Sequence, residues 1–181
     1  MELTSGERTY LNSIKDRINN LSSFLTRQPS PSATTEVAEW YTFLAALKEI
    51  LGNASNGVSF VATVMAKQYL MRTLPLASFD AASKPQGAPG LDIDEKTVDG
   101  KRVIAEIKTT VPYLGSELGA QKAAFKKDFE KLKSAQADYK FFFVTEPSTF
   151  EVVKRRYSEQ LQGVTVVLLT TGEEYWAHAV G

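Results

Sequence analysis

The sequence contains no cysteine and a single histidine, His178, among its 181 residues. Without cysteine there can be no disulfide, no thiolate zinc site and no cysteine nucleophile. One histidine excludes a multi-histidine metal site and argues against a Ser-His-Asp triad. Carboxylate chemistry is what remains for an active site in this chain.

The sequence also lacks a long apolar run. A membrane-spanning helix needs about 18 or more consecutive apolar residues, and no stretch of this chain approaches that length. Residues 1–25 are amphipathic and charged, unlike a signal peptide. Together with the absence of cysteine, these features predict a cytoplasmic protein with no membrane contact.

Neither sign of charge is in excess, because 21 basic residues balance 21 acidic residues. Proteins that bind nucleic acid usually carry a basic excess, so neutrality lowers the expectation of such a partner. It does not exclude one, since carboxylates at a metal site reduce the net charge. The chain is long enough for one sizeable core, and we predict a single domain over residues 1–181.

The order of hydrophobic patterns predicts an α/β fold, with a mainly helical part over residues 1–74 and an α/β core over 75–181. The expected helices begin after a capping signal at Thr4, near Thr35, near Val58, near Gly115 and at Ser148. Two buried strands are expected over 139–145 and 164–170, parallel to each other because a helix connects them. The segment from Leu74 to Gly90 is irregular, which predicts a functional loop or an unrecognised strand.

Asp99-Gly100 predicts a tight turn between two strands, and the loop length decides which side chains share a face. If these two residues formed the whole loop, Ile93 would lie opposite Glu106, and both faces would mix apolar and charged residues. If Val98 joins the loop, with the glycine in the left-handed conformation, Asp92 lies opposite Glu106. We predict the second register, because it separates apolar from charged side chains.

The three-residue loop gathers residues of one kind on each face of the hairpin. The expected apolar face carries Leu91, Ile93, Val103, Ala105 and Ile107. The expected polar face carries Asp92, Asp94, Glu106 and Lys108. Burial of one face and clustering of the charged residues on the other therefore favour the same register.

Two carboxylates and an amine on one sheet face fit a Mg²⁺ site for phosphodiester hydrolysis. Mg²⁺ prefers oxygen ligands and keeps several waters, so Asp92, Glu106 and a backbone carbonyl such as that of Ile107 suffice beside a substrate phosphate. Bound metal lowers the pKa of its water and neutralises charge on the phosphate. Lys108 would orient the water or stabilise the pentacovalent phosphate.

Pro89-Gly90-Leu91-Asp92, followed by a hairpin and Glu106-Ile107-Lys108, resembles the PD-(D/E)xK nuclease superfamily, which includes many type II restriction endonucleases, junction resolvases and repair nucleases. The resemblance covers roughly residues 87–169. In this chain two residues separate the proline from the aspartate, so Asp94 stays eligible as a ligand, although Asp92 is preferred because it lies opposite the glutamate. The resemblance implies a restriction-endonuclease-like mixed β-sheet flanked by helices, with Mg²⁺ as the cofactor and DNA as the substrate.

Other residues give weaker signals of DNA contact. Lys122 and Lys126 share one helix face with Lys133, although a solvated surface is the simpler interpretation of such a face. Gln121 stands where some nucleases of the superfamily use a polar helix residue. Lys84 opens the Gly- and Pro-containing segment that leads to the predicted site.

The sequence therefore predicts a Mg²⁺-dependent DNA endonuclease, resembling a type II restriction enzyme or its cleavage domain. Two alternatives stay open: a junction resolvase or repair nuclease, and a catalytically silent nucleic-acid- or protein-binding module on the same fold. A double-strand break needs two active sites, so we expect a homodimer in contact through the N-terminal helices near Trp40 and Phe43. Fusion to, or a complex with, a DNA-recognition domain is a further expectation.

Overall fold

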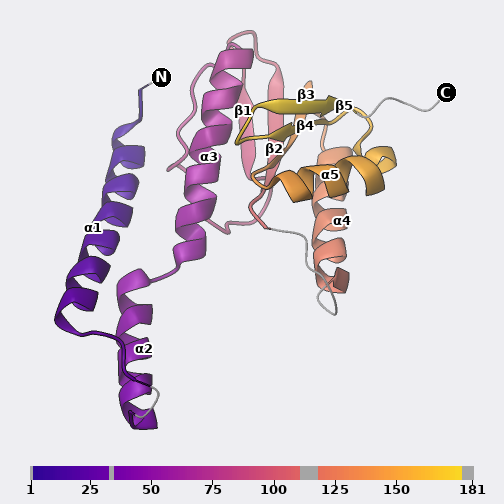
Figure 1. Cartoon of the computed structure of the whole chain (residues 1–181). Coiled ribbons are helices and arrows are strands. Elements are labelled where there is room, and N and C mark those ends of the chain that lie inside the picture. The colour runs from indigo at the N-terminus through magenta and orange to yellow at the C-terminus, as the bar shows by residue number, and fades with distance from the viewer. Residues whose placement is uncertain (1, 33–34, 111–117, 177–181) are drawn as a thin grey trace. The chain divides into compact units, whose positions relative to one another are not determined.

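The computed structural model describes residues 2–32, 35–110 and 118–176 of the chain (Figure 1). Contacts divide it into two compact units, Met1–Gly57 and Val58–Gly181. The sequence placed the helix after residue 58 with the N-terminal helical part. In the structure, most of helix α3 (Ala54–Thr73) instead belongs to the second unit.

The first unit pairs helix α1 (Ser5–Arg27) with helix α2 (Val37–Leu51). The capping signal at the start of α1 is confirmed: the Thr4 hydroxyl accepts from the Glu7 amide at 3.1 Å, and the Glu7 carboxylate accepts from the Thr4 amide at 2.9 Å. The helices meet where Phe24 and Phe43 lie 5.3 Å apart between ring centroids. Phe43 is therefore a core residue of this unit, and it is not available at a dimer interface as the sequence suggested.

The second unit contains a five-stranded sheet in the order β1-β2-β3-β4-β5. The strands are β1 (Ile93–Lys96), β2 (Arg102–Lys108), β3 (Tyr139–Val144), β4 (Thr165–Leu168) and β5 (Glu173–Trp176). The three central strands run parallel, and the edge strands β1 and β5 pair antiparallel with their neighbours. The predicted mixed sheet and the parallel pair β3–β4 are confirmed, whereas β5 was not predicted.

Helices cover both faces of the sheet (Figure 1). On one face, Tyr69 of α3 packs edge-on against Phe141 and Phe143, at 5.9 and 5.5 Å between centroids. On the other face, helix α4 (Leu118–Ser134) brings Phe129 to within 4.9 Å of Phe142. This second cluster also contains residues of helix α5 (Pro147–Arg156) and of the 3₁₀ helix η1 (Ser158–Leu161).

Strand β2 is consequently buried on both faces, which corrects the expectation of one apolar and one solvated face. Ile104 and Glu106 point toward α4 and are as buried as Val103 and Ala105 on the opposite side. Parallel strands with helices on both sides show this pattern. Of the predicted polar face, Glu106 therefore lies beneath a helix, whereas Asp92 and Asp94 are exposed.

The predicted hairpin register is confirmed. Ile93 pairs with Ala105, the Thr97 amide donates to the Lys101 carbonyl at 2.9 Å, and Gly100 has a φ of 84°. Leu91 differs from the prediction, because it packs against the core cluster beneath α4 rather than on the Ile93 face. It precedes the first residue of β1, so strand alternation does not apply to it.

Helix α5 begins differently from the prediction. Its N-cap is Glu146, whose side chain makes no capping hydrogen bond, and Pro147 occupies the first turn. Proline is favoured there, because the first helical amides have no intrahelical partner. The predicted capping box at Ser148 is therefore wrong, and the expected long helix is α5 followed by η1.

Candidate active site

A cavity of about 560 Å³ opens beside the end of strand β2. The irregular segment over residues 79–92 and strand β1 form one wall, and α4 contributes Lys127, Asp128 and Lys131 to the other. The segment predicted to be a functional loop therefore lines a cavity, and this volume lies within the range of ligand-binding clefts.

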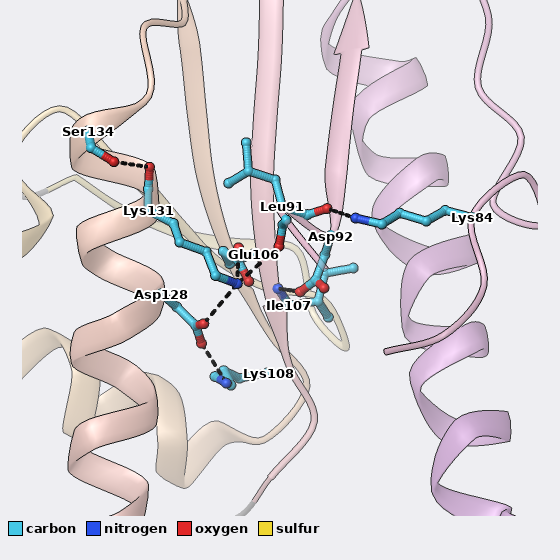
Figure 2. Close-up of polar contacts among 10 residues, drawn as sticks. Lys84, Leu91, Asp92, Glu106, Ile107, Lys108, Asp128, Lys131 and Ser134 are labelled. Carbon is cyan, nitrogen blue, oxygen red and sulfur yellow. Dashed lines mark hydrogen bonds and ion pairs between the residues drawn. The ribbon is translucent and has the colours of Figure 1, made fainter. Parts of the chain in front are cut away.

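Asp92 and Glu106 come together in this cavity as the hairpin register predicts (Figure 2). The β1–β2 ladder ends at the pair Ile93–Ala105, and Asp92 and Glu106 are the residues next to this pair in the sequence. Asp92 Oδ2 accepts a hydrogen bond from the Ile107 amide at 2.8 Å, which fixes this carboxylate beside β2. Glu106 is only 3% exposed.

The Ile107 carbonyl belongs to the same edge of β2. The N–H and C=O groups of one strand residue point to the same side of the strand, and the Ile107 N–H points at Asp92. The neighbouring carbonyl, that of Lys108, accepts from Thr145 on the β3 side. The backbone thus directs the oxygen of Ile107 toward the side where Asp92 lies.

Two residues that the sequence did not identify complete the site. Lys131 Nζ lies 2.9 Å from Glu106 Oε1, 3.1 Å from the Gly90 carbonyl and 3.5 Å from Asp128 Oδ1. Asp128 is 5% exposed, and its Oδ2 lies 2.5 Å from Lys108 Nζ. Figure 2 shows this chain of alternating charges across the gap between β2 and α4.

The one feature of the sequence that could have identified these two residues is the i, i+3 spacing of Asp128 and Lys131. Residues at this spacing share a helix face, and this face adjoins the apolar stripe that carries Phe125, Phe129 and Leu132. Acidic and basic residues on a helix usually indicate a solvated surface. Only the packing of α4 over Glu106 shows that these two face the cavity.

Burial raises the pKa of Glu106 to about 7, and the negative charges of Asp92 and Asp128 act in the same direction. The Lys131 ammonium partly offsets them. A carboxylate with a raised pKa beside other carboxylates is stabilised by added positive charge. The electrostatics of the cavity therefore favour a cation near Asp92 and Glu106.

The donor set fits Mg²⁺. Two carboxylates and a backbone carbonyl are oxygen ligands, and Mg²⁺ usually binds proteins through one or two carboxylates plus waters and substrate phosphate. Over residues 2–32, 35–110 and 118–176, no group of three or more histidine, cysteine or acidic side chains is arranged to hold a metal. A fully protein-ligated cage is thus absent from that part of the chain.

Asp94, the alternative ligand, makes an ion pair instead. The Arg102 guanidinium donates to its two carboxylate oxygens at 2.8 and 2.6 Å. This hydrogen-bonded pair lowers the pKa of Asp94. Because both Asp94 oxygens are engaged, the geometry favours Asp92 as the ligand.

The Asp94–Arg102 pair predicts a small effect of Asp94→Asn. The lowered pKa of Asp94 means that the pair stabilises the fold above the ordinary carboxyl pKa of 3.8, and that this stabilisation disappears as the pH falls through the lowered value. Half-exposed pairs contribute about 0–1 kcal/mol. We expect Asp94→Asn to lose under about 1 kcal/mol at pH 7 by urea unfolding, with a smaller difference at pH 3. A loss that persists undiminished at pH 3 would contradict this assignment.

The four predicted DNA-contact residues do not lie together in the structure. Lys84 lines the cavity and donates to the Leu91 carbonyl, so it supports the segment that carries Asp92. Lys122 and Lys126 are exposed on α4 and line a different groove. Gln121 lies in α4, but its side chain is outside the described residues.

That second groove has a volume of about 520 Å³. Its walls carry four basic side chains against one acidic side chain, and two aromatic residues form its apolar part. The lining residues are Lys122, Lys126, Phe129, Glu130, Lys133, Arg156, Tyr157 and Gln160. The described part of the second unit thus carries a basic groove between α4 and the end of α5.

Comparison with protein-family models, with curated proteins and with solved structures finds no match to this chain. The resemblance to PD-(D/E)xK nucleases consequently rests on the motif and its geometry. Searched over its described residues, the chain has no helix with the length and apolar character needed to cross a membrane.

Proposed function

We propose that this protein is a Mg²⁺-dependent DNA endonuclease with a restriction-endonuclease-like fold. The observation that carries the proposal is that Asp92, held by the Ile107 amide, and Glu106 line one cavity, with Lys108 two residues beyond Glu106 on the same strand. An ordinary solvated strand would expose all three side chains. Here Asp92 is exposed, but Glu106 is buried and its pKa is raised. Perturbed carboxylates in a cleft are typical of functional sites.

Asp92, Glu106 and the Ile107 carbonyl would hold the metal. When bound, Mg²⁺ supplies a Lewis acid for the phosphate and a water of lowered pKa. Lys108 carries the positive charge that would orient the attacking water or stabilise the phosphate oxygens. Asp128 holds the Lys108 ammonium in place, because their charged atoms lie 2.5 Å apart and Asp128 is buried.

The basic groove supports DNA as the substrate. A neutral chain that binds DNA must concentrate its positive charge locally, and the groove sets four basic residues against one acidic residue. Lys127 is exposed on α4 and lines the cavity, so basic residues of this helix lie on both sides. We propose that the DNA backbone crosses α4, with phosphates in both the cavity and the groove.

The double variant Lys126→Glu/Arg156→Glu tests this path. Removal of one basic side chain that binds a phosphate reduces the slope of log affinity against log salt by about 1, so we expect a slope smaller by about 2 and affinity at least about 10-fold weaker at 100 mM salt. Fluorescence anisotropy with a labelled duplex in Ca²⁺, which we expect to support binding without cleavage, measures both quantities. Lys15→Glu/Lys96→Glu changes the net charge equally at exposed positions outside the groove. An equal decrease in affinity for both double variants would refute the proposed path.

Substrate selectivity separates the three candidate functions. A restriction enzyme produces discrete fragments from long DNA and discriminates its site by several kcal/mol, whereas a resolvase or repair nuclease prefers branched or damaged DNA. A silent module binds DNA without cutting it in any divalent metal. Neutral net charge favours base recognition over purely electrostatic binding, so we expect discrete fragments from phage-length DNA. A uniform smear of DNA fragments at sub-stoichiometric enzyme would refute sequence specificity, but it would still support the nuclease proposal.

Cleavage of both DNA strands calls for two active sites, and we propose a homodimer. Because Phe43 packs against Phe24, the exposed apolar residues of α2 become the candidate contact: Val37, Tyr41 and Leu44 are 81%, 75% and 54% exposed. A DNA-recognition domain, fused or in complex, is the alternative source of specificity. A cytoplasmic location also stays a prediction.

A further inference from the structure

The Lys131 ammonium is bound by three oxygen atoms of the candidate site. They belong to Glu106, the Gly90 carbonyl and Asp128, at 2.9, 3.1 and 3.5 Å. The arrangement, two carboxylates and one carbonyl around a positive charge, is that of a cation site whose cation is covalently attached to α4. Lys131 is not one of the motif residues on which the resemblance to PD-(D/E)xK nucleases rests.

We propose that Lys131 is a tethered cation that neutralises the site in the metal-free protein, leaves Glu106 when the metal binds, and then contacts a phosphate oxygen of the DNA. This inference rests on the proposed metal-dependent nuclease function and names a further substrate-contacting residue of that site.

The electrostatics require a cation at this place. Asp92, Glu106 and Asp128 bring three carboxylates to one cavity, and Glu106 and Asp128 are buried there. A buried charge without a partner is costly, and natural proteins pair such charges. Lys131 supplies the partner while the metal is absent.

The same charge opposes the metal. Lys131 Nζ donates a hydrogen bond to Glu106 Oε1, which is one of the oxygens that Mg²⁺ would use. Like charges a few ångströms apart in a partly buried site repel more strongly than they do in water. A divalent ion at Glu106 therefore displaces the ammonium, and wild-type affinity for the metal is reduced by the work of that displacement.

The side chain can make this movement. Lysine has a flexible four-carbon stem, and Lys131 is 31% exposed although both of its carboxylate partners are nearly buried. Asp128 lies one helical turn away and can retain the ammonium after it leaves Glu106. The released ammonium stays in the cavity that the scissile phosphate must enter.

Substitution of Lys131 should therefore have opposite effects on metal binding and on cleavage. Lys131→Met is expected to bind metal about 10-fold more tightly, because the repulsion is gone. It is also expected to cleave DNA at least about 10-fold more slowly at saturating metal, because no ammonium then stabilises the phosphate oxygen. A residue that only supports the fold would change both quantities in the same direction.

The measurement is calorimetric titration of Mn²⁺ into wild-type protein, Lys131→Met and Lys127→Met at pH 8. Lys127 is the matched control, since it lines the same cavity from the same helix. Its affinity for Mn²⁺ should stay within about 3-fold of wild type. Lys131→Gln, which keeps a hydrogen-bond donor without the charge, should also bind Mn²⁺ more tightly, and it replaces Lys131→Met should that variant fail to fold.

Distinct outcomes overturn the two proposals. If the wild type binds Mn²⁺ and the folded Lys131 variant binds it equally or more weakly, the tethered cation is wrong and the nuclease proposal stands. Tighter metal binding with unchanged cleavage would overturn the phosphate contact. If neither wild type nor the variants bind Mn²⁺, the proposed function fails and this inference fails with it.

Discussion

Glu106→Gln and Asp92→Asn are each expected to reduce the rate of DNA cleavage by about 1,000-fold or more, because each removes a carboxylate that would hold the proposed metal, and the metal would supply the positive charge that the reacting phosphate needs. Lys108→Ala should have a comparable effect, since its ammonium is positioned by buried Asp128 beside the same strand end. Conversion of supercoiled plasmid in Mg²⁺ measures these rates, and circular dichroism verifies that each variant is folded.

Asp94→Asn is the matched control for these variants. It removes a carboxylate two residues after Asp92, one that is held by Arg102 and lies opposite Ile104. We expect its cleavage rate to stay within about 3-fold of wild type. Full activity in Glu106→Gln would refute the site. If Asp94→Asn is inactive and Asp92→Asn is active, Asp94 is the metal ligand instead of Asp92, and the rest of the proposed site is unchanged.

The metal-free protein is expected to lose stability as the pH rises from about 5 to about 7, and Glu106→Gln should remove that loss. The pKa of Glu106 is about 7 in the folded state and 4.5 ordinarily, so between these values the folded chain binds more protons than the unfolded chain. Stability then falls with increasing pH. The full shift corresponds to about 3 kcal/mol, and partial relaxation of the site reduces this to about 1–3 kcal/mol.

Urea unfolding of wild type and Glu106→Gln in EDTA, at pH 5 and pH 8, measures this effect. Because other groups titrate in both proteins, the informative quantity is the difference between them, and we expect the variant to be the more stable protein at pH 8. Parallel pH dependence would show that Glu106 keeps an ordinary pKa in the fold. Mg²⁺ should restore wild-type stability more at pH 8 than at pH 6, because the proton on Glu106 competes with the metal.

The parts of the site that the sequence predicted depend on local rules. Strand alternation and the glycine turn were enough to predict the register of the β1–β2 hairpin, which brings Asp92 and Glu106 together where the ladder ends. A one-residue slip would have moved every side chain to the wrong face. The parallel pair β3–β4 followed from the helix between these strands. The α/β class and the mixed sheet were predicted for the same reason.

The parts that were missed depend on packing between distant segments. Lys131 reaches Glu106 across 25 residues of sequence, and nothing in the pattern of α4 shows that its charged edge lies over β2. Strand β5 begins with two exposed glutamates and is four residues long, so neither hydrophobicity nor length identified it. Leu91 lies just before β1, where the chain has left the strand alternation that predicted its face.

Incubation of the wild-type protein with supercoiled plasmid in Mg²⁺, Ca²⁺ or EDTA tests the central claim most directly. The carboxylates of Asp92 and Glu106 at one cavity predict conversion to nicked and linear DNA in Mg²⁺, and none in Ca²⁺ or EDTA. Equal cleavage in EDTA would contradict metal-dependent hydrolysis at this site. Absence of cleavage in every divalent metal, on plasmid, long linear and branched DNA alike, would instead identify a silent binding module.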